Sequence, residues 1–89
     1  MSAPIAASSG QARHELLRWV AANAHLPGEE LDERSPLLGE ASVVDSLALV
    51  SLTFLIEDLR GAPIPPDDYT DLVRFSTVEN IVQAYFGSD

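Results

Sequence analysis

The sequence contains no cysteine and no lysine, and its five basic residues are all arginine. The absence of cysteine excludes a disulfide framework, a thiolate metal site and a cysteine nucleophile. No apolar run approaches the roughly 20 residues that span a bilayer, so we expect no membrane insertion. Residues 1–10 lack the basic start and long apolar stretch of a signal peptide, which makes a cytoplasmic location the default expectation.

Motifs that carry catalytic or metal chemistry are also scarce. The two histidines, His14 and His25, have no partner at a catalytic or metal-ligating spacing, and the five glycines are too scattered for a phosphate-binding loop. The acidic run 29–33 lacks the alternating oxygen ligands and central glycine of a calcium loop. We therefore expect a protein that is not an enzyme and holds no metal.

Charge is strongly one-sided, with 14 acidic residues against five basic ones and a net charge of −9 over 89 residues. Segment 29–71 contributes the entire excess, because the flanking segments carry net charges of +1 and −1 that cancel. Such a surface repels nucleic acid and attracts basic partners. The length allows one small domain, and the 46% hydrophobic content is enough for it to fold.

The first half of the chain predicts a flexible tail, a helix and a long connection. Residues 1–10 are small and polar and are expected to form the tail, whereas 11–87 form the domain. A helix over 11–24, ended by Pro27-Gly28, follows from its apolar spacing. Its apolar face consists of Leu16, Leu17, Val20, Ala21 and Ala24. The connection that follows has no period, and its apolar anchors are Leu31, Leu37 and Leu38.

The second helix, over 46–59, carries two apolar stripes and ends at Gly61, a typical C-terminal cap. An inner stripe suited to a core consists of Leu49, Leu52, Ile56 and Leu59. An outer stripe consists of Leu47, Val50 and Phe54. A helix in so small a domain seldom buries two faces. The outer stripe is therefore either unusually well covered or exposed as a binding surface.

The last part of the chain predicts a short helical turn within 69–74 and a final helix. That helix begins at Ser76 or Thr77, and the spacing of Ser76 and Glu79 is typical of a capping box. Its inward face consists of Val78, Ile81, Val82 and Tyr85. The predicted fold is all-α, a small four-helix bundle of three main helices and one short one, with a long first loop.

Asp45 and Ser46 stand where the long connection meets the second helix. The ordinary interpretation is that one of them caps the helix, as Asp and Ser commonly do. Their position, however, favours a functional role over a simple cap, because the helix that Ser46 opens carries the outer stripe. Ser46 is therefore the candidate for chemistry.

Segment 15–86 resembles the acyl, aminoacyl and peptidyl carrier proteins. The resemblance rests on Asp45-Ser46-Leu47 before an apolar helix, on Ile64-Pro65 after it, and on Ser76-Thr77-Val78 at the last helix. It implies that Ser46, with Asp45 as part of the motif, carries a 4′-phosphopantetheine arm transferred from coenzyme A by a separate enzyme. The thiol of the arm holds an acyl or aminoacyl group as a thioester, which gives thiol chemistry to a chain without cysteine.

The resemblance also implies a partner-binding face on the second helix of a monomeric protein. Apolar contact would come from the outer stripe, and charge from Asp45, Glu57 and Asp58. The implied partners are a phosphopantetheinyl transferase, a loading ligase or adenylation enzyme, and downstream acyl-processing enzymes with basic docking surfaces.

Details of the sequence separate the chain from fatty-acid carriers. Val43-Val44 stands where those carriers have Gly-Ala, and Ala48 and Ser51 stand where they have acids. With Phe75 before the last helix, the pattern is more similar to the aminoacyl and D-alanyl branch. We expect a discrete carrier in a specialised pathway of secondary metabolism.

Two other functions are compatible with the same residues. The first is an unmodified small helical domain that docks to other proteins through the second helix. The second is an enzyme with Ser46 as nucleophile, for which the sequence offers no nearby base.

Overall fold

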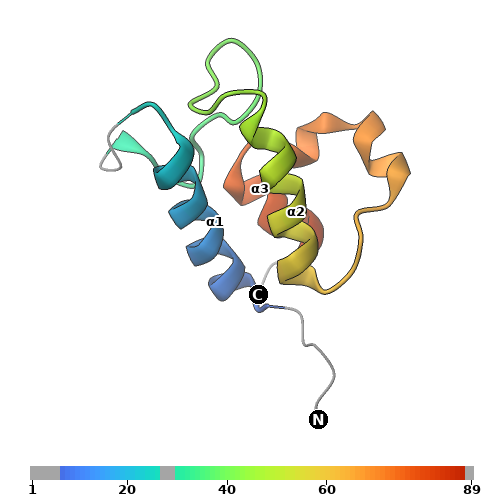
Figure 1. The fold of residues 1–89 in the computed structure, drawn as a ribbon. Coiled ribbons are helices and arrows are strands. Elements are labelled where there is room, and N and C mark those ends of the chain that lie inside the picture. The colour runs from blue at the N-terminus through green and yellow to red at the C-terminus, as the bar shows by residue number, and fades with distance from the viewer. Residues whose placement is uncertain (1–6, 27–29, 88–89) are drawn as a thin grey trace.

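The computed structural model describes residues 7–26 and 30–87, and these are mostly helical (Figure 1). They form α1 (Ser9–Asn23), α2 (Ala48–Arg60), the 3-10 helices η2 (Pro66–Thr70) and η3 (Leu72–Phe75), and α3 (Val78–Tyr85). The only strand-like feature in this part of the chain is an isolated bridge between Ala24 and Val44. The predicted helical class is confirmed. The count of four helices is not, because two 3-10 helices stand where one short helix was expected.

Helix α1 begins two residues earlier than the sequence indicated. Ser8 has extended backbone geometry, and its side chain accepts a hydrogen bond from the Gln11 N–H at 3.2 Å, so it is the N-cap. Residues 8–10 of the expected tail thus belong to the start of the helix. Residues 1–6 of that tail and the Pro27-Gly28 pair lie outside the described residues.

Helix α2 begins two residues later and ends one residue later than the predicted 46–59, and its predicted C-terminal cap, Gly61, is confirmed. Gly61 adopts the left-handed region at φ 70°, and its N–H donates to the Glu57 carbonyl at 2.9 Å. A side chain at this position would strain the backbone, which explains the glycine.

Helix α3 does not use the predicted capping box. Thr77 is the N-cap, and its hydroxyl accepts from the Asn80 N–H at 3.1 Å. Ser76 has helical angles, φ −74° and ψ −26°, because it still belongs to the turn that ends η3. An N-cap needs extended geometry, so Ser76 cannot serve. Glu79 instead pairs with Arg34 at 3.1 Å.

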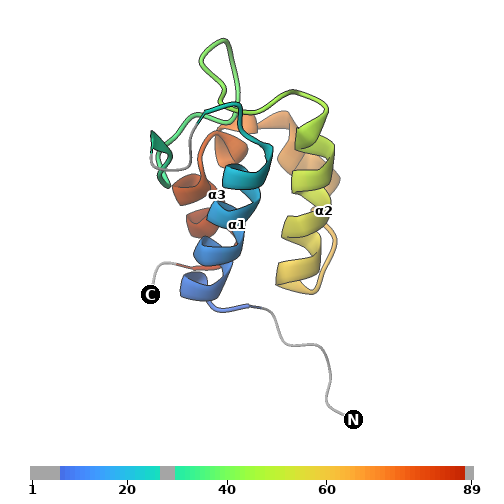
Figure 2. The same cartoon turned by 60° about the vertical axis from the view of Figure 1, so that its left-hand side comes forward.

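The three α-helices lie side by side around one core, with α1 against both α2 and α3 (Figures 1 and 2). Every element contributes to this core except η2, none of whose residues is buried. The core residues are Leu16, Val20, Leu37, Val43, Val44, Leu52, Ile56, Ile64, Phe75, Val78, Ile81 and Val82.

The long connection is fastened at several points. Leu37 is fully buried, and its N–H donates to the Ser76 carbonyl at 2.8 Å. Val43 is buried too, and its N–H donates to the Pro36 carbonyl at 2.9 Å. The His25 N–H donates to the Val43 carbonyl at 3.1 Å, so the far end of the connection is tied to the end of α1. These bonds fix the point at which α2 starts.

Both described ends of the chain lie at the end of the bundle away from the start of α2 (Figures 1 and 2). The Ala7 N–H donates to the Leu59 carbonyl at 2.7 Å, which places Ala7 beside the last turn of α2. In the described part of the chain, no helix has the length and apolar character needed to cross a membrane.

Candidate functional site

Ser46 lies in a tight turn that leads into α2. The Ala48 N–H donates to the Asp45 carbonyl at 3.0 Å, and the Leu49 N–H donates to the Ser46 carbonyl at 3.2 Å. These backbone bonds start the helix at Ala48, with Leu47 as an N-cap that makes no side-chain hydrogen bond. The ordinary interpretation, in which Asp45 or Ser46 caps the helix through its side chain, does not hold in the structure. The Ser46 side chain is exposed, and its hydroxyl has no hydrogen-bond partner among the described residues.

The outer stripe follows Ser46 along α2 and faces solvent. Leu47 is 84% exposed, Val50 56% and Phe54 65%. The inner stripe lies on the core side, where Leu52 and Ile56 are buried. Of the two possibilities raised by the sequence, the structure shows the exposed one.

The acidic residues predicted for partner contact differ in their surroundings. Asp45 and Asp58 are exposed. Glu57 is half-buried, and its carboxylate Oε2 accepts a hydrogen bond from the Ile64 N–H at 2.9 Å. That bond holds the turn after α2, so Glu57 has a structural role that the sequence did not indicate.

A shallow hollow of about 120 Å³ opens beside Ser46. It is lined by Leu37, Leu38, Gly39, Ser42, Val44, Ser46 and Leu49. Next to it, an apolar groove of about 330 Å³ runs between α2 and the 3-10 helices, and we call it the α2–η3 groove. Its lining consists of Leu38, Leu49, Val50, Leu52, Thr53, Tyr69, Leu72 and Phe75. Leu38 and Leu49 border both spaces, so apolar surface continues from Ser46 into the groove.

The sequence did not reveal the second wall of this groove. Tyr69, Leu72 and Phe75 are spaced three residues apart, which is the period of a 3-10 helix. Asp71 separates η2 from η3 and has non-helical backbone angles, so this spacing aligns only Leu72 and Phe75 within one 3-10 helix. The structure brings Tyr69 to the same wall, and the Tyr69 and Phe75 rings stack with centroids 5.7 Å apart.

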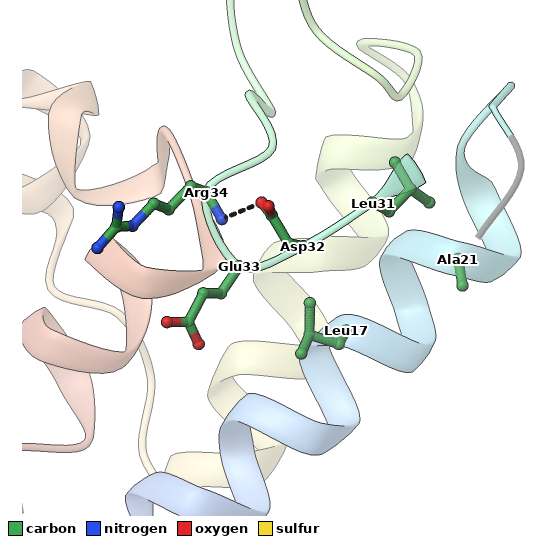
Figure 3. A pocket seen from close by; sticks show the side chains of 6 residues that line it. All are labelled: Leu17, Ala21, Leu31, Asp32, Glu33 and Arg34. Atoms are coloured by element: carbon green, nitrogen blue, oxygen red, sulfur yellow. Dashed lines mark hydrogen bonds between the residues drawn. The ribbon is translucent and has the colours of Figure 1, made fainter. Parts of the chain in front are cut away.

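A larger hollow of about 560 Å³ lies between α1 and the start of the long connection (Figure 3). The Asp32 carboxylate there accepts from the Arg34 N–H at 2.8 Å, and the Arg34 side chain turns away to Glu79. Glu33 pairs with Arg13 of α1 at 2.9 Å. The charged residues of this hollow thus fasten the connection to α1 and α3, and this structural role is why the hollow is not taken as the functional site.

Other side chains that could take part in chemistry lie apart from Ser46. His14 and His25 are exposed on and after α1. Within residues 7–26 and 30–87, no group of three or more His, Asp or Glu side chains is arranged to hold a metal ion. Burial, and then the hydrogen bond to the Asp68 carboxylate, raise the pKa of Tyr85 above its ordinary value. Tyr85 joins α3 to η2 and does not border the hollow at Ser46.

No protein-family profile, curated protein sequence or solved structure shows significant similarity to this chain.

Proposed function

We propose that the protein is a discrete acyl or aminoacyl carrier, modified on Ser46 with 4′-phosphopantetheine, that presents a biosynthetic intermediate to partner enzymes. The observation that carries the proposal is the state of Ser46. Its exposed hydroxyl is free of any capping bond, and it stands at the head of a helix whose outer stripe is exposed. A surface serine without a structural task, next to an apolar face, suits a tethering point on a docking surface.

The surroundings of Ser46 fit a phosphodiester. The first turn of α2 contains no acidic side chain, so its helix dipole favours an anion there, while the neighbouring Asp45 carboxylate is exposed to solvent. The hollow beside Ser46 leaves its hydroxyl open to solvent and to an approaching enzyme. When bound, the arm supplies the thiol that this cysteine-free chain lacks.

The modification itself needs a second protein. The transferase would join the Ser46 Oγ to the phosphorus next to the pantetheine part of coenzyme A. The pyrophosphate bond breaks, the adenosine bisphosphate part leaves, and the serine proton passes to a base on the transferase. Ser46 thus needs no base of its own, and the residues that line its hollow include no ionisable side chain.

Partner enzymes would dock on the outer stripe and on the exposed carboxylates at its two ends. Leu47 and Phe54 provide apolar contact, whereas Asp45 and Asp58 favour a basic surface. Glu57 contributes less to this contact than the sequence suggested, because its carboxylate is committed to Ile64.

Intact-mass measurement tests the modification. We expect the purified protein, incubated with coenzyme A, magnesium and a broad-specificity phosphopantetheinyl transferase, to gain the mass of one phosphopantetheinyl group. Ser46→Ala should gain nothing. The matched control is Ser51→Ala, which removes another exposed serine hydroxyl from α2 and should gain the group in full. No gain in the unaltered protein, or an equal gain in Ser46→Ala, would overturn the proposal.

The exposure of the outer stripe also favours a second function that does not depend on Ser46. An unmodified domain that docks other proteins through Leu47, Val50 and Phe54 would have the same apolar face. This function predicts partner binding that persists in Ser46→Ala, together with the absence of any added mass.

A further inference from the structure

The hollow of about 120 Å³ beside Ser46, here called the Ser46 hollow, is lined by Ser46 itself. Ser46 does not line the larger α2–η3 groove. Apart from the hydroxyls of Ser42 and Ser46, the side chains that line the hollow are apolar, and none is ionisable. The first atoms of any group attached to the Ser46 hydroxyl therefore lie next to a small apolar space.

Hydrogen bonds close the loop that forms one side of this hollow. The Ser42 hydroxyl lies 2.7 Å from the Val44 carbonyl and 2.9 Å from the Leu37 carbonyl, the two acceptors between which its proton is shared. It also accepts from the Val44 N–H at 3.2 Å. The Ser42 N–H donates to the Gly39 carbonyl at 3.2 Å. Because the Ser42 hydroxyl is satisfied within the loop, an apolar group can cover it without leaving a polar group unpaired.

Gly39 keeps one edge of the hollow free of a side chain. Its φ of 84° is in the left-handed region, which side-chain-bearing residues rarely adopt, so the turn favours glycine. A Cβ placed at this position would meet no atom within 4 Å. The hollow is therefore formed by the closed loop and stays open on the side of Gly39.

The size and lining of the Ser46 hollow select one part of the phosphopantetheine arm. A cavity of about 150 Å³ holds benzene, so 120 Å³ has room for a somewhat smaller branched aliphatic group. The arm carries such a group close to its phosphate, a quaternary carbon with its methyl groups. The rest of the arm consists mainly of a hydroxyl, amides and the terminal thiol. The amides would lose hydrogen bonds to water in an apolar hollow, so they are disfavoured there.

We propose that the Ser46 hollow holds the dimethyl group of the arm against Leu38, Val44 and Leu49. The inference rests on the proposed function for the presence of the arm, and it deepens that function by assigning residues of this chain to the arm. Burial of one or two methyl groups favours the held position by about four- to tenfold. The part of the arm nearest the phosphate would thus be fixed at the start of α2, whereas the amides and the thiol remain free to reach a partner enzyme.

The first test uses the full chain with the arm attached at Ser46 and with its methyl groups labelled with ¹³C. We expect nuclear Overhauser effects between these methyl protons and the side chains of Leu38 and Val44. The amide signals of Gly39 and Ser42 should shift when the arm is attached. An arm that lacks the two methyl groups should shift them less.

The second test does not depend on attachment. Free pantetheine is added to the protein with Ser46 unmodified and is compared with the same compound without its two methyl groups. Because the two compounds carry the same polar groups, their difference reports the methyl groups alone. We expect the amide signals of Gly39 and Ser42 to respond to pantetheine, and the compound without methyl groups to need about four- to tenfold higher concentrations.

Two variants separate the Ser46 hollow from the groove. Leu38 borders both spaces, and Leu38→Ala should weaken the effects at Val44 and the response to pantetheine several-fold. The matched control is Leu72→Ala, since Leu72 lines the groove but not the hollow. It should keep both.

Where Ser46 accepts the arm, the effects within the modified protein decide. Their absence would overturn the proposal, as would contacts of the methyl groups with Leu72 in place of Val44, and the carrier proposal would still stand. Where Ser46 gains no mass, the carrier proposal fails and the free compounds decide. An equal response to both compounds would then overturn the hollow proposal, and a preference for pantetheine would support it. The two failures are thus distinguishable.

Discussion

At the scale of single residues, Tyr85 makes more connections than its sequence position suggests. Its hydroxyl donates to the Asp68 carboxylate at 2.8 Å, and its ring lies 5.9 Å from that of Phe75. The Arg60 guanidinium lies 4.9 Å above the same ring, and Arg74 lies 4.0 Å from Asp68. Tyr85 thus joins η2, η3 and the end of α2 to α3. These contacts hold the second wall of the groove in place.

The raised pKa of Tyr85 gives a pH prediction. The folded protein holds this phenol proton more tightly than the unfolded chain, whose tyrosine has a pKa of about 10. The contribution of Tyr85 to the free energy of unfolding is therefore fully present below pH 10 and declines as the pH rises above it. Urea unfolding between about pH 8 and 11 should show this decline in the unaltered protein and a smaller one in Tyr85→Phe. Tyr69→Phe, which removes the other tyrosine hydroxyl, should retain it, and identical profiles for all three proteins would contradict the prediction.

At the scale of elements, the long connection behaves as a packed part of the bundle. Leu37 is buried among the core residues of the helices, and Val43 and Val44 are buried with it. The two valines bury apolar surface immediately before Asp45 and Ser46. The exposed serine therefore directly follows a buried, well-packed segment.

Removal of the Leu37 side chain should be costly. Leu37→Ala leaves a cavity in the core, and we expect the free energy of unfolding to fall by about 3 kcal/mol. The matched control is Leu26→Ala, since Leu26 also follows α1 but is 41% exposed, and its loss should change the value by less than about 0.5 kcal/mol. Urea unfolding followed by circular dichroism measures both. A loss in Leu37→Ala no larger than in Leu26→Ala would mean that the connection is not anchored through this residue.

The sequence predicted those features whose signal lies within one element. The helical period of α2 assigned Leu52 to the buried stripe and Phe54 to the exposed one, and Gly61 marked the end of the helix. Both features depend on local geometry alone. The cap of α3 was assigned to the wrong residue, since the angles of Ser76 are set by the preceding 3-10 turn. The groove was missed, because its walls come from segments that are distant in the sequence. Ser46 was found from its position, yet its lack of a capping bond needed the structure.

At the scale of the whole molecule, the net charge of −9 contributes little to stability and remains available for binding. The four ion pairs formed among the described residues are all partly exposed, and such pairs contribute little each. Exposed acids such as Glu40 and Asp58 make no side-chain hydrogen bond among the described residues and repel one another across a small surface. This repulsion opposes the compact state and leaves a negative field available to basic partners.

Salt should therefore stabilise the fold. Between about 0.01 and 0.15 M potassium chloride, the distance over which charges interact shrinks from roughly 30 to 8 Å. We expect the free energy of unfolding to rise by on the order of 1 kcal/mol, as the long-range repulsion is screened. Replacement of Glu40 and Asp58 by Gln and Asn should reduce this rise. A fall in stability with added salt would indicate that the ion pairs outweigh the repulsion.

The placement of the first and last described residues has a practical consequence. Ala7 lies beside Leu59, and both α1 and α3 meet the same end of the bundle, opposite the turn that holds Ser46 (Figure 1). A fluorescent protein or an immobilisation tag fused at either end should therefore hang from the far pole and leave the serine unobstructed. The same arrangement suits surface-attached assays, because a molecule tethered by one end would orient the turn that holds Ser46 toward the solution.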